Sequence, residues 1–141
     1  MKVIVGVDGS ASSSRAVEWC AAHAQALGAE VIAVHSIEMP VYAASGFGAV
    51  PLPAACEPDH EAIRELMQHE WCASLTAAEV PFTTVVADGS AAGSIIAVAE
   101  REHADLVITG RRGLGGFKEL LLGSTSHELS HHLGCPLVIV P

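Results

Sequence analysis

The chain has 141 residues, with 7 Lys plus Arg against 16 Asp plus Glu, and its net charge is −9. This length predicts one domain spanning residues 1–141, and an apolar fraction of 50% excludes an intrinsically disordered chain. The negative charge argues against binding to DNA or RNA, because nucleic-acid phosphates are held by basic protein surfaces.

Short apolar segments alternate with longer helical patterns along the whole chain. Each segment is rich in Val or Ile and shows little polar alternation, which is typical of strands covered on both faces of a parallel sheet. They predict five strands: Val3–Val7, Val31–His35, Phe82–Val86, Leu106–Thr109 and Leu137–Val140.

The stretches between these segments carry apolar residues at helical spacing. The first helix is predicted to end at Gly28, a later helix to begin with Ser90 as its N-cap, and the last to stop before Gly134 and Pro136. The predicted apolar faces contain Val17, Cys20, Ala24 and Leu27; then Ile63, Leu66, Trp71 and Leu75; then Ile95, Ile96 and Ala99; and finally Leu129 and Leu133.

Regular alternation of strands and helices predicts β-α-β units with right-handed crossovers. The predicted fold class is therefore α/β, a single open five-stranded parallel sheet with helices on both faces. Ligands of such sheets bind beyond the carboxyl ends of the strands, which here means Asp8–Ser10 and the segment that starts at Gly110. Met39–Pro58 is the one long irregular connection, and the sequence does not determine whether it folds over the site as a lid.

We see no export or membrane signal in the sequence. The longest charge-free stretch, Met39–Cys56, contains three prolines and cannot form one membrane-spanning helix. The cysteines form no C-x-x-C pair, and without an export signal we expect reduced thiols at Cys20, Cys56, Cys72 and Cys135. A cytoplasmic protein that does not bind membranes is the resulting expectation.

Glycines and basic residues are concentrated after the fourth predicted strand. Four glycines occur within the seven residues 110–116, and such positions let backbone N–H groups approach an anion closely. Arg111, Arg112 and Lys118 lie in the same segment, so residues 106–118 sum to +3 and the rest of the chain to −12. An acidic protein with one basic, glycine-rich segment indicates a pocket for one small anion.

The last predicted helix starts beside a second pair of small residues, Gly123 and Ser124. Thr125 and Glu128 have the spacing of a capping box, which supports a helix start here. The N–H groups at this helix start would face the same space as the glycine-rich loop. Two familiar phosphate-binding patterns do not fit, because a glycine stands at the Walker A lysine position and Lys118 at the third glycine of a dinucleotide fingerprint.

The glycines after the fourth strand also follow a specific spacing. Gly110, Gly113, Gly123 and Ser124 satisfy G-x2-G-x9-G-S/T, and V-D-G-S at 7–10, A-V-H at 33–35 and C-P-L-V-I-V-P at 135–141 accompany it. This pattern resembles the universal stress protein family over essentially the whole chain. The resemblance implies a Rossmann-like sheet ordered 3-2-1-4-5 and a homodimer formed through Leu137–Val140. It also implies binding of ATP, AMP or another adenine nucleotide, with or without Mg²⁺.

The resemblance further implies which residues form the nucleotide site. They are Gly6, Asp8, Ser36, Gly110, Arg111, Arg112, Gly113, Gly123, Ser124 and Thr125. Residues 110–113 would hold the ribose and phosphates, and residues 123–125 would complete the phosphate cradle. Asp8 and Gly6 would lie along the nucleoside, and the backbone of Ser36 would meet the adenine edge. The chain departs from the family at Ser36, where valine is commoner, and carries Arg112 at a variable position.

Two other readings use the same loop. A slow ATPase or self-phosphorylating protein would place Ser124 or Thr125 near the γ-phosphate, although Asp8 is the one evident general base. A nucleotide-free dimer would hold only a chloride or phosphate ion there. The preferred reading is a regulator in the stress response that binds an adenine nucleotide, with no catalytic residue assigned.

A zinc hydrolase is a further alternative, because His127-Glu128-Leu129-Ser130-His131 spells H-E-x-x-H. A catalytic zinc site needs a third protein ligand. His132 points about 100° away around the helix, and Cys135 lies just past the predicted helix end. We therefore assign no metal ligand.

Overall fold

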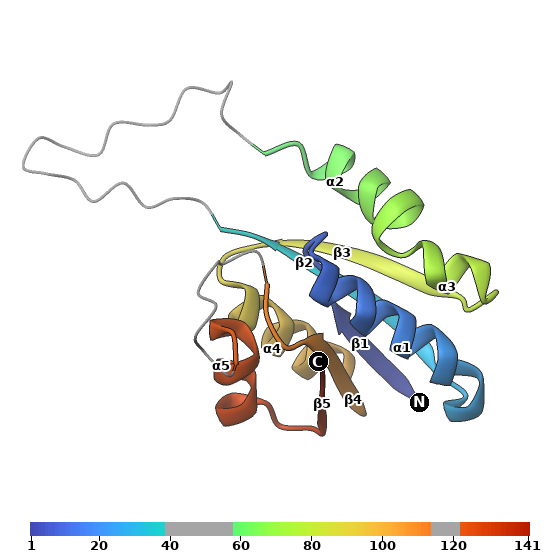
Figure 1. Ribbon diagram of the computed structural model, residues 1–141. Helices are drawn as coiled ribbons and strands as arrows, with labels where there is room; N and C mark the ends of the chain where they lie inside the picture. Colours follow the sequence, from blue (N-terminus) through green and yellow to red (C-terminus); the bar gives the residue numbers. More distant parts are fainter. Residues whose placement is uncertain (39–57, 114–121) are drawn as a thin grey trace, which may run out of the picture.

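The computed structural model describes residues 1–38, 58–113 and 122–141 (Figure 1). Within them lies a five-stranded parallel sheet of order β3-β2-β1-β4-β5, which confirms the predicted α/β class and strand order. The strands are β1 (Lys2–Gly6), β2 (Glu30–Ile37), β3 (Phe82–Asp88), β4 (Leu106–Gly110) and β5 (Leu137–Val140). The predicted long connection lies outside the described residues, apart from Pro58 at its end.

The helices begin and end close to the predicted signals. They are α1 (Ala11–Leu27), α2 (His60–Leu66), the π-helical segment η2 (Met67–Trp71), α3 (Ala73–Ala77), α4 (Ala91–Glu102) and α5 (Ser124–His132). Gly28 ends α1 in the left-handed conformation, and the Ser90 hydroxyl caps α4 by accepting a hydrogen bond from the Gly93 amide. Among the helices in the described parts of the chain, none is long and apolar enough to cross a membrane.

Two apolar layers cover the two faces of the sheet. One layer packs α1, η2 and α3 against β1, β2 and β4, and the other packs α4 and α5 against the opposite face of the same strands. Figure 1 shows α1 and α3 on one side of the sheet and α4 and α5 on the other. The interior strand β1 contributes Val3 and Val5 to the first layer and Ile4 to the second, because successive side chains of a strand point to opposite faces.

The two edge strands differ from the sequence prediction. All five segments were expected to be covered on both faces, yet most residues of β3 and β5 are only half-buried. Each edge strand has one neighbour in the sheet, so its far side is less covered than that of β1 or β4. The strand β2 is also longer than expected, because its pairing with β3 continues as far as Ile37 opposite Asp88.

Helical periodicity predicts two leucines on apolar helix faces that the structure leaves partly exposed. Leu27 and Leu66 were counted with the apolar faces, but they are 37% and 38% exposed. Leu27 is the last residue of α1, where the helix extends beyond the core. After Leu66 the chain changes from α-helix to π-helix, which rotates the following residues and buries Met67.

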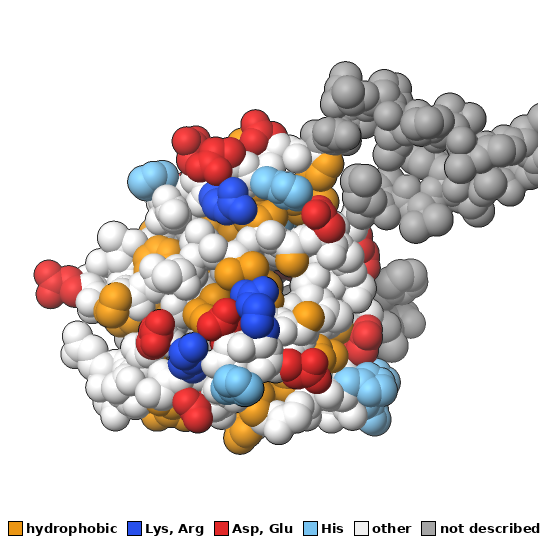
Figure 2. Space-filling model, turned by 180° about the vertical axis from the view of Figure 1, so that it is seen from behind, with side chains coloured by type: hydrophobic (Ala, Val, Ile, Leu, Met, Phe, Trp, Pro, Cys, Tyr) orange, Lys and Arg blue, Asp and Glu red, His pale blue; other side chains and the backbone are white. Residues whose placement is uncertain are grey.

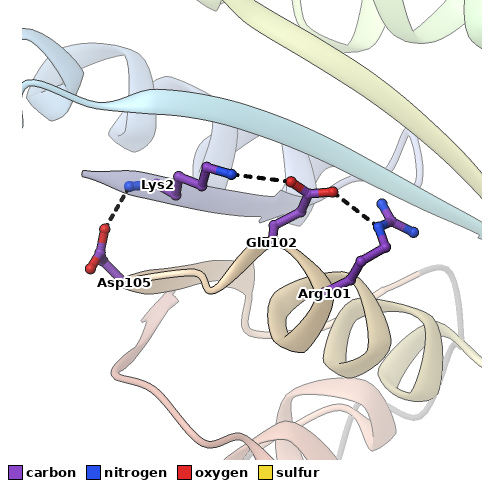
Figure 3. Close-up of polar contacts among 4 residues, drawn as sticks. All are labelled: Lys2, Arg101, Glu102 and Asp105. Carbon is purple, nitrogen blue, oxygen red and sulfur yellow. Dashed lines mark hydrogen bonds and ion pairs between the residues drawn. The ribbon is translucent and has the colours of Figure 1, made fainter.

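A polar network joins β1 to the connection between α4 and β4 (Figure 3). The Lys2 amide donates to the Asp105 carboxylate at 2.7 Å, and the Lys2 ammonium pairs with Glu102 at 3.2 Å. Arg101 also donates to Glu102, and these hydrogen bonds, first from Arg101 and then from Lys2, lower the pKa of the Glu102 carboxyl. The network lies at the amino end of β1, away from the carboxyl ends of the strands where ligands bind. It therefore stabilises the fold and does not belong to a ligand-binding site.

Charged side chains of both signs are mixed on one face of the molecule. On the face shown in Figure 2, acidic, basic and histidine side chains of the described residues are interspersed among apolar ones, without a continuous basic area. Two cysteines are inside the protein: Cys20 and Cys72 are buried, and burial raises the pKa of each thiol to about 11. These two thiols are therefore protonated at neutral pH, which is typical of cysteines buried in an apolar core.

Candidate functional site

A pocket opens at the carboxyl ends of β1, β2 and β4, where the strand order reverses. The first turns of α1, α4 and α5 complete its wall, and this is where open parallel sheets bind ligands. The pocket is lined by Gly6, Val7, Asp8, Ser13, Val34, His35, Ser36, Ala91, Ile95, Thr109, Gly110, Arg112, Gly113, Gly123, Ser124, Thr125 and Ser126.

The turn between β1 and α1 holds a carboxylate at the pocket. Asp8 accepts a hydrogen bond from the Ser10 amide at 2.9 Å, and its own amide donates to the Ser13 hydroxyl at 3.3 Å. Ser10 is the N-cap of α1 and accepts from the Ser13 amide. Gly9 has φ +75°, and a Cβ there would lie 2.9 Å from the indole of Trp71, so only glycine fits this turn.

The loop after β4 is fastened to three other elements by its backbone. Gly110 lies directly on α1, because a Cβ at this position would be 2.6 Å from the backbone of Ser12. The Arg112 amide donates to the Ser12 hydroxyl at 3.2 Å. The Arg111 amide donates to Val140 of β5, and the Arg111 carbonyl accepts from the Gly123 amide at the start of α5.

The start of α5 differs from the prediction in one respect. The helix starts beside Gly123 and Ser124 as expected, but the predicted capping box of Thr125 and Glu128 is wrong, since the N-cap is Gly123, which has no side chain to cap the helix. Thr125 lies inside the first turn, and Ser126 instead shares its hydroxyl proton between the carbonyls of Arg111 at 3.0 Å and Gly123 at 3.1 Å. This contact ties the start of α5 to the loop, but because the hydroxyl donates, it does not cap the helix N–H groups.

The charges and dipoles of the pocket favour an anion. Three helices of 17, 12 and 9 residues begin at its wall, and each helix N-terminus carries a partial positive charge. Arg112 adds a full positive charge, and Asp8 is the one carboxylate among the described lining residues. The buried Nε of Arg112 has no hydrogen-bond partner within residues 1–38, 58–113 and 122–141.

The opposite end of the pocket is formed by β2 and the turn before α4. The Ser36 hydroxyl donates to the Gly89 carbonyl at 2.5 Å and accepts from the Ser94 hydroxyl at 2.9 Å, so this side chain joins β2 to that turn. His35 Nδ1 donates to the Val7 carbonyl at 2.8 Å, so this ring nitrogen carries a proton. His35 is half-buried, and this contact joins β2 to the end of β1.

The structure brings nine of the ten sequence-predicted site residues together around this pocket. The exception is Arg111, whose backbone links β5 and α5 but which is not among the lining residues. Sequence reasoning did not select Ser13, Thr109 or Ser126. Of these, Ser126 had a local signal, because it belongs to the run G-S-T-S, whereas Thr109 and Ser13 are recognisable only from the packing.

The H-E-x-x-H pattern lies away from this pocket. His127 and His131 are exposed on α5, and their rings are neighbours with centroids 4.7 Å apart. In the described part of the chain, no group of three or more His, Cys, Asp or Glu side chains comes together as a metal site. The pair therefore has no third protein ligand among those residues.

Comparisons with known proteins point to one family. The family model for the Universal stress protein family matches residues 1–141. The universal stress protein YxiE of Bacillus subtilis is 33% identical over 99% of this chain and 97% of its own length. A universal stress protein of Thermus aquaticus is also 33% identical, over 98% of this chain and 96% of its own.

Solved structures show the same fold. A universal stress protein in complex with cAMP has a TM-score of 0.74 at 21% identity and covers 100% of this chain and 97% of that one. An Archaeoglobus fulgidus universal stress protein in complex with dAMP has a TM-score of 0.69 at 16% identity, covering 100% and 98%. An Arabidopsis thaliana protein of this family with AMP bound has a TM-score of 0.64 at 19% identity, covering 99% and 90%.

Proposed function

This chain belongs to the universal stress protein family, whose model matches it from residue 1 to residue 141, and from that premise we propose that its pocket binds an adenine nucleotide. The observation that carries the proposal is one pocket that gathers nine motif-derived residues and three helix N-termini. Family members solved with cAMP, dAMP and AMP support adenine as the base.

The phosphates are assigned to the end of the pocket between Gly110–Gly113 and α5. A Cβ at Gly113 would lie 2.7 Å from the Asp8 carboxylate, so the glycine keeps the space beside that side chain open. The first N–H groups of α5 have no partner within the helix, and the N-cap Gly123 has no side chain to accept from them. Backbone donors and a helix dipole together make a suitable phosphate cradle.

The nucleoside is assigned to the other end, between β1, β2 and α4. Gly6 lets α4 approach the sheet closely, because a Cβ there would lie 2.9 Å from the Ile95 side chain. Ile95 and Ala91 give this end an apolar wall, and Ser36 places backbone and hydroxyl groups beside it. An apolar slot with a few polar groups suits a purine ring.

We assign ATP as the nucleotide and regulation as the role. The extended, anion-favouring wall from Arg112 to α5 supports a ligand with several phosphates. In this proposal the protein acts in the cytoplasm during the stress response, and partner proteins recognise its nucleotide-bound state.

The substitution Gly113→Val tests the pocket. Millimolar ATP should raise the melting temperature of the wild type, since a ligand at one hundred times its Kd stabilises the folded state by about 2.7 kcal/mol. The variant should lose this shift, because its side chain fills the space beside Asp8, while the domain stays folded because Gly113 is exposed and the new contact is with the end of the Asp8 side chain rather than with backbone. Differential scanning fluorimetry measures both quantities.

The matched control is Gly134→Val, where a Cβ meets no atom within 4 Å and the ATP shift should persist. Mass spectrometry of small molecules released from freshly purified protein identifies the nucleotide carried in the cell. A wild type that shows no shift with ATP, ADP or AMP and releases no nucleotide contradicts the proposed function.

We also propose a homodimer formed through β5. This strand is at the edge of the sheet with one neighbour, and an unpaired apolar edge strand promotes association. Ile139 is half-buried and belongs to neither core layer, so Ile139→Lys should disrupt the dimer without unfolding the subunit. Sedimentation velocity at micromolar concentration should give a dimer for the wild type and a monomer for the variant; a monomeric wild type contradicts the proposal.

A further inference from the structure

Arg112 has an unusual environment in the nucleotide pocket. Its backbone is held in place, since its amide donates to the Ser12 hydroxyl at 3.2 Å and its neighbour Arg111 bonds to β5 and α5. Its side chain lines the pocket, and its Nε is the one buried side-chain nitrogen or oxygen without a partner among the described residues. A buried polar group without a partner destabilises a protein unless something else satisfies it.

The other charges of the pocket do not neutralise this guanidinium. Asp8 is the one carboxylate in the described lining, and hydrogen-bond contacts hold it in the turn before α1, where it accepts from the Ser10 amide. No hydrogen bond or ion pair joins Asp8 to Arg112 within the described chain. The positive charge of Arg112 is therefore available to a ligand.

The pocket lining gives magnesium few protein ligands. Nucleotide-bound Mg²⁺ usually takes one or two carboxylates in addition to phosphates and retained waters, and the one carboxylate among the described lining residues is Asp8, which already accepts from the Ser10 amide. A guanidinium, in contrast, presents several N–H donors in one plane and matches the oxygens of a phosphate. Three helix N-termini add further positive potential to the same wall.

Resting on the proposed function, we propose that Arg112 binds the nucleotide phosphates directly and that the protein therefore holds its nucleotide as a metal-free anion. The buried Nε of Arg112 then obtains its partner from the ligand. Arg112 is a ligand-binding and specificity-determining residue, because it selects nucleotides that carry phosphate over the free nucleoside.

Isothermal titration calorimetry with ATP, in excess EDTA and in millimolar Mg²⁺, tests the proposal on the full chain. Wild-type affinity should agree within about threefold between the two conditions. Arg112→Gln should weaken ATP binding in EDTA by about 10- to 100-fold, the effect of one lost hydrogen bond to a charged group. Mg²⁺ should restore part of this loss, because the metal then takes over charge neutralisation. Arg112→Lys should fall between the two proteins.

The matched control is Arg111→Gln, which removes the same charge one residue away, outside the pocket lining, and should change the affinity less than threefold. Adenosine, which lacks phosphate, should bind the wild type and Arg112→Gln equally. The melting temperature of the nucleotide-free Arg112→Gln protein should not fall, whereas a purely structural role for Arg112 requires that it does.

The outcomes separate this inference from the proposed function. If ATP binds the wild type only in Mg²⁺, or if Arg112→Gln binds ATP in EDTA as the wild type does, the role of Arg112 is refuted while nucleotide binding stands. If the wild type binds no adenine nucleotide in either condition, the proposed function itself fails.

Discussion

Replacing Gly110 by alanine is expected to lower the free energy of unfolding by about 1–3 kcal/mol and to abolish nucleotide binding. The added Cβ would lie 2.6 Å from the backbone carbon and oxygen of Ser12, far inside van der Waals contact. A backbone cannot rotate away as a side chain can, so α1 or the end of β4 must shift. That shift also breaks the hydrogen bond from the Arg112 amide to Ser12, which positions the phosphate-binding loop.

Urea unfolding and ATP titration measure the two effects of Gly110→Ala. Gly134→Ala is the control, because this exposed glycine has no atom within 4 Å of its added Cβ and should stay within about 0.5 kcal/mol of the wild type. A Gly110→Ala protein with the wild-type unfolding midpoint and the wild-type ATP affinity would show that the contact with Ser12 is not required.

Leu129→Ala is expected to destabilise the protein by about 2–5 kcal/mol, the cost of removing a buried leucine side chain from a packed core. Leu129 is fully buried and is the residue through which α5 joins the layer formed with α4. Because α5 is only nine residues long, it depends on this packing to remain helical. The variant should therefore also bind ATP more weakly, since α5 supplies part of the phosphate cradle.

The control for Leu129→Ala is Leu66→Ala, which truncates a leucine that is 38% exposed on α2. We expect it to cost well under half as much, because less apolar surface leaves the core. Chemical denaturation of the two variants in parallel provides the comparison. Equal losses at the two positions would contradict the assignment of Leu129 as the anchor of α5.

Most of the sheet could be predicted from local sequence patterns. Segments such as Val3–Val7 and Leu106–Thr109 are short, apolar and rich in β-branched residues, which favours strands buried on both faces, and the structure has strands there. Gly28 and Ser90 marked helix ends because each satisfies backbone groups within its own turn. These signals are local, so a single sequence reveals them.

Predictions failed where distant parts of the chain decide the outcome. Thr125 and Glu128 have capping-box spacing, but α5 begins two residues earlier with Gly123 as its N-cap, where the Gly123 amide bonds back to the loop at Arg111. Periodicity counted Leu66 with the apolar face, but the π-helical segment that follows it places Met67 in the core instead. Neither the loop contact nor the change of helix type has a signature in the adjacent residues.

The two adjacent arginines of the site also differ in a way that only the tertiary structure reveals. Arg111 and Arg112 are adjacent, carry the same charge and could not be distinguished by sequence reasoning. The hydrogen bonds of Arg111 to β5 and α5 and of Arg112 to α1 set the path of the loop, and only Arg112 lines the pocket.

By itself the sequence determined the fold class, the strand order through its family resemblance, and nine residues that the structure gathers around one pocket. Glycine spacing and helix starts are properties of nearby residues in the chain. They can be predicted because backbone conformation limits which residues fit tight turns and helix ends. The tertiary structure decided which side chains face the pocket, that Gly110 has no room for a Cβ, and that Arg112 is left without a described partner. These features depend on contacts between residues about 100 positions apart, and such distances are set only when the sheet and its helices pack.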